Sequence, residues 1–181
     1  LLSAVSVFAA TEPNLLPAPP AINADAYLLA DFDTGTVLAK RNADRRLPPA
    51  SLTKLMTAYI LAQEIESGRL KLSDEVVVTR NSWSQNRVFR GSSLMWIEPG
   101  KSVTLAELER GIVISSGNDA SVAVAEHIAG SEAAFVDLMN QYAEQLGLEG
   151  THFKNSHGLP HKDHFSTARD LATMASAAIR D

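Results

Sequence analysis

Ser51 and Lys54 lie three residues apart at the start of an apolar segment, residues 49–60 (PASLTKLMTAYI). Apolar side chains recur in this segment at three- and four-residue spacing: Leu52, Leu55, Met56, Tyr59 and Ile60. The spacing predicts a helix that buries one face, with Ser51 and Lys54 on one side of its first turn. A lysine is unfavourable at the positive end of a helix dipole, so capping does not explain Lys54.

The pair is suited to nucleophilic catalysis. A partly desolvated lysine loses some of its preference for the charged form and can act as a base, and the serine hydroxyl that it deprotonates becomes a nucleophile. The alternative is structural: Ser51 caps the helix and Lys54 extends to solvent, as in most Ser-x-x-Lys tetrads. The tetrad alone does not decide between the two.

A second motif, Ser116-Gly117-Asn118, interrupts another helical pattern, and an apolar helix resumes after it. The tripeptide predicts a tight turn between two helices, which can project both polar side chains into a cavity. By itself it is better explained as a helix C-cap followed by an Asn N-cap. However, Ser-x-x-Lys followed by a serine and asparagine tripeptide matches the first two parts of the signature of class A β-lactamases and penicillin-binding proteins.

Local patterns predict the elements that position the first motif. Two apolar runs flank Asp33-Thr34-Gly35 and predict a β-hairpin. The first helix is expected over Ser51–Ser67. Short strands are predicted at Glu75–Thr79 and Ser93–Ile97, separated by a polar loop over Asn81–Ser92 that can border a cleft.

The second half of the chain is predicted to be helical. Thr104 and Glu107 fit a capping box at the start of the helix that precedes the second motif. Further helices are expected over residues 131–146, with Gly147 past the end, and from Thr167 beyond Ala178.

Composition limits the class of protein. The chain has 181 residues, of which 45% are hydrophobic and 20% charged, as expected for one globular domain. A net charge of -5 without a basic stripe argues against nucleic-acid binding. The chain has no cysteine, which excludes disulfides, thiol catalysis and cysteine-bound metal.

The N-terminal segment indicates export. Residues 1–10 (LLSAVSVFAA) are uncharged and end in small residues, as in a signal-peptide remnant with a cleavage site near Ala9 or Ala10. The alternative is a buried first strand or helix, because ten residues are too few to span a bilayer. Residues 11–25 are rich in proline near their centre and are expected to form an extended leader before a domain over residues 26–181.

Six ordered segments carry a resemblance to a known family: PASLTKLMT, GSSLMWIEPG, RGIVISSGNDASVAVAEHIAGS, AFVDLMN, LGLEGTHFKNSHGL and STARDLA. From about Ala26 to its end, the chain resembles the low-molecular-mass penicillin-binding proteins that are D-alanyl-D-alanine carboxypeptidases. The resemblance implies an α/β, serine β-lactamase-like penicillin-binding transpeptidase fold, with an antiparallel sheet flanked by helices and without a cofactor.

The resemblance also implies an activity and its residues. The activity is that of a periplasmic serine peptidase that removes the terminal D-alanine from peptidoglycan pentapeptide stems and is acylated by β-lactam antibiotics. Ser51 then corresponds to the nucleophile and Lys54 to its general base. Ser116 relays a proton toward the leaving amine, and Asn118 holds the amide oxygen of the substrate. His157 belongs to the family's His-Gly-Leu loop and is expected to line the cleft.

One part of the family's signature is absent from the chain. No Lys-Thr-Gly or Lys-Ser-Gly is present, and Lys101-Ser102-Val103 lacks the glycine and precedes the second motif. We therefore expect an N-terminal portion of a longer protein, whose fold is incomplete in this chain. The resemblance further implies attachment to the outer face of the inner membrane through a C-terminal anchor that lies outside this chain.

Two other functions remain open. A class A-like β-lactamase would share the fold and the nucleophile, but it needs a glutamate-activated water, and no Glu-x-x-Leu-Asn follows Asn118. Its second motif is also Ser-Asp-Asn, whereas this chain has Ser-Gly-Asn. The second alternative is a noncatalytic peptidoglycan-binding module that keeps the pocket without turnover.

A cluster of histidines raises the question of a metal. Four of them fall within thirteen residues: His152, His157, His161 and His164. Structural zinc sites usually have tighter paired spacing and often cysteine ligands, so no metal is expected.

Overall fold

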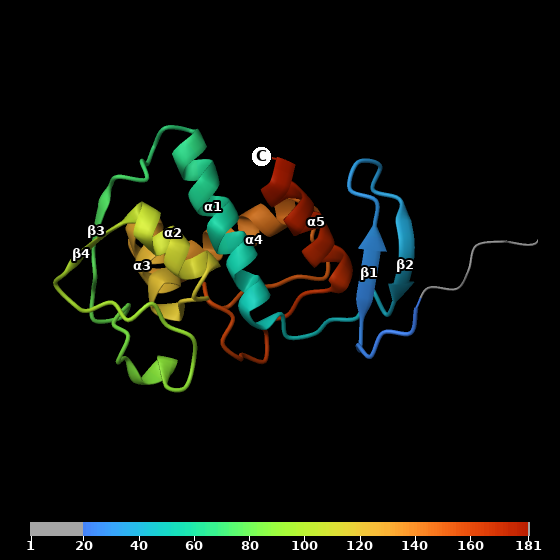
Figure 1. Ribbon diagram of the computed structural model, residues 1–181, viewed down its shortest axis with the longest axis horizontal. Coiled ribbons are helices and arrows are strands. Elements are labelled where there is room, and N and C mark those ends of the chain that lie inside the picture. Colours follow the sequence, from blue (N-terminus) through green and yellow to red (C-terminus); the bar gives the residue numbers. More distant parts are fainter. Residues whose placement is uncertain (1–19, 181) are drawn as a thin grey trace, which may run out of the picture.

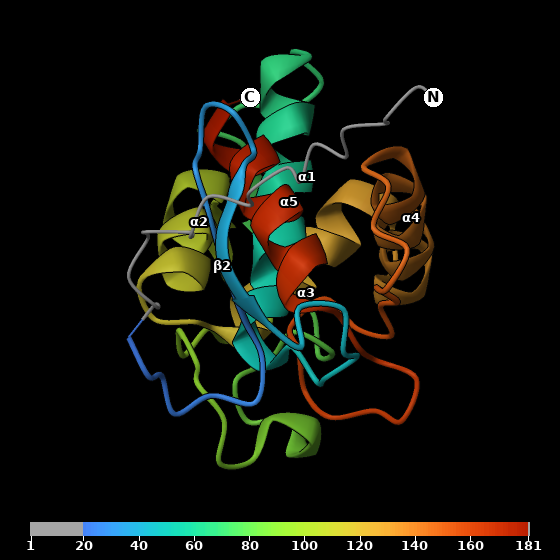
Figure 2. The same cartoon turned by 90° about the vertical axis from the view of Figure 1, so that its right-hand side faces the viewer.

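The computed structural model describes residues 20–180, so the expected signal-peptide remnant and most of the expected leader lie outside the described residues. In space, a small two-stranded sheet lies at one end of the molecule, a group of helices in the middle and a β-hairpin at the other end (Figure 1). Figure 2, viewed from the hairpin end, shows the hairpin in front and α5 beside it. Among the described residues, no helix is long and apolar enough to cross a membrane.

The predicted hairpin is confirmed. Strand β1 (Tyr27–Ala30) pairs antiparallel with β2 (Val37–Arg41), so that Tyr27 faces Arg41. The turn is stabilised by the carboxylate of Asp31, which accepts hydrogen bonds from both the backbone N–H and the hydroxyl of Thr34. Strand β1 packs against helix α5 (Ala168–Arg180), and α5 in turn packs against α1 (Lys54–Glu66).

The predicted first helix is present, but its first turn has a tighter geometry. A 3₁₀ turn, η1 (Ala50–Thr53), leads directly into α1 (Lys54–Glu66), and Gly68 follows with a φ of +73°. Met56 and Ile60 are fully buried, as the periodicity indicates. The expectation that Leu52 joins this buried face is wrong, since Leu52 lies in η1 and is 52% exposed.

The second sheet contains one of the two predicted short strands and one strand that the sequence did not predict. Strand β3 (Glu75–Val77) pairs antiparallel with β4 (Ser102–Thr104), not with residues 93–97. The predicted strand at Ser93–Ile97 is wrong, because the backbone N–H groups of residues 95–97 donate to the carboxylate of Asp119 and not to a neighbouring strand. The polar loop before this segment contains a short 3₁₀ turn, η2 (Arg87–Phe89).

Local signals correctly predict the helices of the second half. Helix α2 (Leu105–Val113) starts at a complete capping box formed by Thr104 and Glu107. Helices α3 (Asn118–Ala129) and α4 (Glu132–Gln145) follow.

Two apolar clusters share α1 and fix its position. One joins α1 to α4 and α5, and its fully buried members include Ile60, Phe135 and Met174. The other joins α1 to α2, α3 and β3 through residues such as Leu61 and Leu108. Because α1 is packed from both sides, its N-terminus is held firmly where the first motif lies.

Candidate active site

The first motif lies at the junction between η1 and α1. Ser51 is exposed, whereas Lys54 is the first residue of α1 and is only 4% exposed. Lys54 Nζ lies 3.4 Å from Ser51 Oγ. The preceding residue, Ala50, has a φ of +50°, in the left-handed region that non-glycine residues seldom adopt.

The Lys54 amine has two short hydrogen bonds in addition to the contact with Ser51. Nζ donates to Asn118 Oδ1 at 2.7 Å and to the backbone oxygen of His157 at 2.7 Å. A neutral amine has two N–H bonds and one lone pair. When both N–H bonds are directed at these acceptors, the lone pair is left for the hydroxyl proton of Ser51.

Burial favours this neutral form of Lys54. Desolvation lowers the pKa of the amine from 10.5 to about 8, and the nearby carboxylate of Asp119 opposes the shift. A base with a pKa near the working pH combines a useful neutral fraction with the strength to accept a proton. The structural alternative, in which Lys54 extends to solvent, is therefore wrong.

The second motif forms the predicted turn between α2 and α3. Ser116 has a φ of +53°, and its Oγ is buried without a hydrogen-bond partner among the described residues. Ser116 lines a pocket of about 210 Å³ together with Ser51 and Lys54. A buried hydroxyl without a partner is costly, so the position of Ser116 beside this pocket calls for a functional explanation.

Asp119 connects the second motif to the rim of the cleft. Its carboxylate is fully buried and accepts hydrogen bonds from the backbone N–H groups of Met95, Trp96 and Ile97 at 2.8 to 3.2 Å. The N–H of Asn118 donates to the backbone oxygen of Ser93. These bonds hold residues 93–97 against the start of α3.

A larger cleft of about 460 Å³ opens at Ser51 and Asn118. His157 lines one side of this cleft. Its Nδ1 accepts a hydrogen bond from the N–H of Leu159, so the ring proton of the neutral imidazole is on Nε2. Burial and the charge of Lys54 lower the pKa of His157 to about 4, so the ring is neutral near pH 7.

The remaining histidines of the cluster point in different directions. His164 is buried, with Nε2 2.7 Å from Thr53 Oγ1, while His152 Nδ1 contacts the backbone oxygen of Asp163 and His161 is exposed. Within residues 20–180, no group of three or more histidine and acidic side chains is arranged to hold a metal ion.

The residues brought together are thus Ser51, Lys54, Ser116, Asn118 and His157. Lys101 and Ser102 instead lie at β4, and neither lines either pocket that contains Ser51. The arrangement places an exposed serine hydroxyl, a buried amine, a hydroxyl without a partner and an amide beside one cleft, and these are the residue types that acyl transfer uses.

Comparison with solved structures defines the class of protein. Penicillin-binding protein 5 from Haemophilus influenzae superposes with a TM-score of 0.88 and 41% identity, over 91% of this chain and 47% of that chain. Penicillin-binding protein 6B from Escherichia coli gives a TM-score of 0.87 and 45% identity, over 92% of this chain and 53% of that chain. The expected penicillin-binding serine peptidase fold is therefore confirmed.

Sequence comparison then identifies the family. The peptidase S11 family model, described as D-alanyl-D-alanine carboxypeptidase, matches residues 13–181, and the chain belongs to this family. The D-alanyl-D-alanine carboxypeptidase DacA of Escherichia coli strain K12 is 48% identical over 169 residues, which cover 93% of this chain and 42% of that protein. The chain thus spans less than half the length of this relative.

Several residues that support the site were not found from the sequence. Thr57, Ser156 and Glu132 make hydrogen bonds behind the cleft, and Asp119 fixes its rim. Asp119 had a signal in the sequence, since it directly follows the candidate site residue Asn118. The others are ordinary polar residues of a helix or loop, and only the fold shows what they contact.

Proposed function

We propose that this chain supplies the nucleophile and base of a serine-type D-alanyl-D-alanine carboxypeptidase, within a catalytic domain that includes residues 26–181. The observation that carries the proposal is the environment of Lys54 Nζ, which makes two hydrogen bonds of 2.7 Å and lies 3.4 Å from Ser51 Oγ. In the neutral amine the two N–H bonds go to these acceptors, and the lone pair is left for the hydroxyl proton of Ser51. The match to the carboxypeptidase family and the similarity to DacA support the substrate class, peptidoglycan stems that end in D-alanyl-D-alanine.

Acylation begins when the hydroxyl proton of Ser51 passes to Lys54 Nζ. Ser51 Oγ forms a bond to the carbonyl carbon of the penultimate D-alanine, and the carbonyl oxygen becomes an oxyanion. The N–H of Ser51 lies in the first helical turn, where backbone donors lack helical partners, and it can donate to this oxyanion. Asn118 orients the peptide through its side-chain amide.

Collapse of this intermediate breaks the bond to the terminal D-alanine. The leaving amine takes a proton from Ser116, which is replenished from the Lys54 ammonium. Water then attacks the ester carbonyl, its proton returns through Lys54 to Ser51 Oγ, and the shortened peptide leaves. The free hydroxyl of Ser116 in the pocket of Ser51 and Lys54 supports this relay.

The proposal includes inhibition and cellular location. A β-lactam presents a strained amide to the same nucleophile, and its ring-opened ester stays attached to Ser51. The substrate lies outside the cytoplasm, so the whole protein is proposed to be exported and to work at the outer face of the inner membrane, attached by a segment outside this chain. No cofactor has a role in this chemistry.

The test is a time course of intact mass after addition of benzylpenicillin to the full-length protein, with D-alanine release from a pentapeptide measured in parallel. A lasting single adduct on Ser51, together with D-alanine release, is expected, and Ser51→Ala should remove both. A short-lived adduct without D-alanine release would identify a β-lactamase. The absence of any adduct on the folded protein would favour the noncatalytic binding module.

A further inference from the structure

Glu132, the first residue of α4, lies behind the cleft and outside the set of residues assigned above. We propose that Glu132 is a positioning residue for Lys54, and that it acts by anchoring the segment Asn155–Leu159, here called the 155–159 loop. The inference deepens the proposed function, because it concerns how the base of that reaction is held. It depends on three sets of contacts.

The first set joins the 155–159 loop to α1. Thr57 donates its hydroxyl proton to the backbone oxygen of Ser156 at 2.6 Å, and Lys54 donates to that of His157 at 2.7 Å. Gly158 passes so close to the backbone oxygen of Ala50 that a Cβ at this position would collide with it. The loop therefore lies directly against the turn that carries Ser51.

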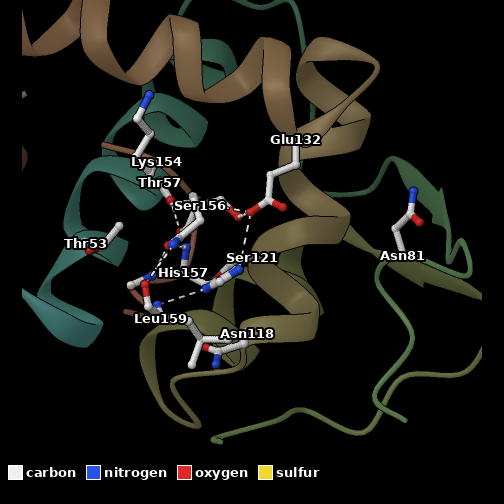
Figure 3. A network of polar contacts seen from close by, with 12 residues as sticks. Thr53, Thr57, Asn81, Asn118, Ser121, Glu132, Lys154, Ser156, His157 and Leu159 are labelled. Atoms are coloured by element: carbon white, nitrogen blue, oxygen red, sulfur yellow. Dashed lines mark hydrogen bonds and ion pairs between the residues drawn. The ribbon is translucent and has the colours of Figure 1, made fainter. Parts of the chain in front are cut away.

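The second set joins the same loop to α4 (Figure 3). One oxygen of Glu132, Oε1, accepts hydrogen bonds from the backbone N–H of Ser156 at 3.0 Å and from its hydroxyl at 2.8 Å. The same oxygen lies 3.5 Å from Nε2 of His157, the ring nitrogen that carries the proton. Three donors of two buried residues thus converge on a single carboxylate oxygen.

The third set shows that the loop holds its own shape between these attachments. The side-chain oxygen of Asn155 accepts from the N–H of Gly158 at 2.6 Å, and the ring of His157 accepts from the N–H of Leu159 at 3.1 Å. A loop with such internal bonds moves as a unit. Its position on α1, and with it the backbone oxygen that holds Lys54, depends on its outer attachment to Glu132.

Removal of the Glu132 acceptor should therefore change the hydrogen bonds of Lys54. The N–H and hydroxyl of Ser156 would be buried without a partner, which favours movement of the loop toward water. The backbone oxygen of His157 would move with it, so that one N–H of Lys54 loses its acceptor and the lone pair is no longer directed at Ser51. Water that enters beside Lys54 would also restore its preference for the charged form.

The chain offers a matched control. Glu126, on α3, lines the same pocket of about 360 Å³ as Glu132, and it also accepts two hydrogen bonds, from Thr79 and Asn81. Its carboxylate contacts neither the 155–159 loop nor Lys54 in these bonds. Glu132→Gln is the second control, since it removes the charge at the start of α4 but keeps an oxygen that can accept from Ser156.

The experiment measures two quantities in the full-length protein and its variants. The first is the rate constant for acylation by benzylpenicillin. The second is the pKa of Lys54 in the unliganded protein, from ¹³C NMR of its Cε, with the signal assigned by Lys54→Arg. The other ionisable groups that face Lys54 are Asp119 on α3 and His157 in the loop, and all variants keep both.

Glu132→Ala should lower the acylation rate constant by about tenfold or more, the scale expected when a reacting group is displaced. It should also raise the Lys54 pKa toward the ordinary lysine range, while Glu132→Gln and Glu126→Ala stay near wild type in both quantities. If Glu132→Ala does not fold, Ser156→Ala should move both quantities in the same directions.

Three results would overturn the positioning role: an unchanged Lys54 pKa in the alanine variant, an equal effect of Glu126→Ala, or failure of glutamine to restore the wild-type values. The two measurements also separate the inference from the proposed function. If wild-type protein is not acylated on Ser51, the proposed function fails, whereas the titration of Lys54 still decides whether Glu132 positions it.

Discussion

The pH dependence of acylation tests the assignment of Lys54 as the base. Only the neutral amine can take the proton of Ser51, so raising the pH should speed acylation until Lys54 is fully deprotonated. With a pKa of about 8, roughly 1% of the amine is neutral at pH 6, about 10% at pH 7 and about 90% at pH 9. The rate constant should therefore rise about 90-fold from pH 6 to pH 9 and level off above it.

The shape of this curve separates a buried lysine from an ordinary one. An amine that keeps a pKa of 10.5 would be only about 0.03% neutral at pH 7, and the logarithm of the rate would rise linearly through pH 9 without levelling off. The pKa shift from 10.5 to about 8 thus raises the neutral fraction at pH 7 by about 300-fold, which corresponds to about 3 kcal/mol.

The assay is stopped-flow acylation with a chromogenic β-lactam at constant ionic strength. Hydroxide-catalysed hydrolysis is measured in a protein-free sample and subtracted from the rate measured with protein. Lys54→Arg is the control, because a guanidinium stays charged across this range and should leave no rising limb. His157 does not contribute, since its pKa of about 4 lies below the window. A rate that is independent of pH between 6 and 9, or one that rises without a bend, would refute the reasoning.

Two further predictions concern stability. Gly158→Ala should lower the free energy of unfolding in urea by about 2 to 4 kcal/mol, because φ is +93° and the new Cβ meets the backbone oxygen of Ala50. Gly91→Ala is the control: φ is +76°, but the space around it is open, so the loss should be only about 1 kcal/mol. Equal costs would contradict the close approach. The pKa of both His157 and His164 is lowered to about 4, so the unfolded chain binds more protons between about pH 6.5 and 4, and stability should fall through this window as the pH drops. His164→Gln should reduce the slope of unfolding free energy against pH, and an unchanged slope would count against the buried neutral ring.

The sequence predicts those parts of the fold that depend on nearby residues. The hairpin follows from Asp31 to Gly35 and their bonds to one another, and α2 follows from the reciprocal bonds of Thr104 and Glu107. These signals lie within five residues of the structure that they determine. Local chemistry is therefore sufficient for them.

The segment at Ser93–Ile97 shows where local reasoning fails. Its apolar composition favours a strand, but the carboxylate of Asp119, more than twenty residues away, binds its backbone N–H groups and replaces a neighbouring strand as acceptor. Leu52 is a related case, since its periodicity matches the buried face while the tight 3₁₀ turn places it outside the helix.

The same distinction applies to the site. Ser51, Lys54, Ser116 and Asn118 could be proposed from the sequence because their residue types are those that acyl transfer uses. The acceptor that completes the environment of Lys54 is a backbone oxygen of His157, which any residue at that position would supply. Residue type therefore carries no signal for it, and only the path of the chain reveals its role.

The site also shows how a fold maintains unfavourable local geometry. Ala50 and Ser116 both have left-handed backbone angles, each of which costs about 1 to 3 kcal/mol. Ala50 is the first residue of η1 and lies against the backbone of Gly158, while Ser116 lies in the turn before α3, whose Asp119 binds the backbone of the cleft rim. Ala50 directly precedes Ser51, and Ser116 carries the hydroxyl without a partner, so relaxation at either would move a group of the proposed site. The contacts behind the cleft therefore stabilise a geometry that the local sequence alone would not adopt, and the proposed reaction depends on that geometry.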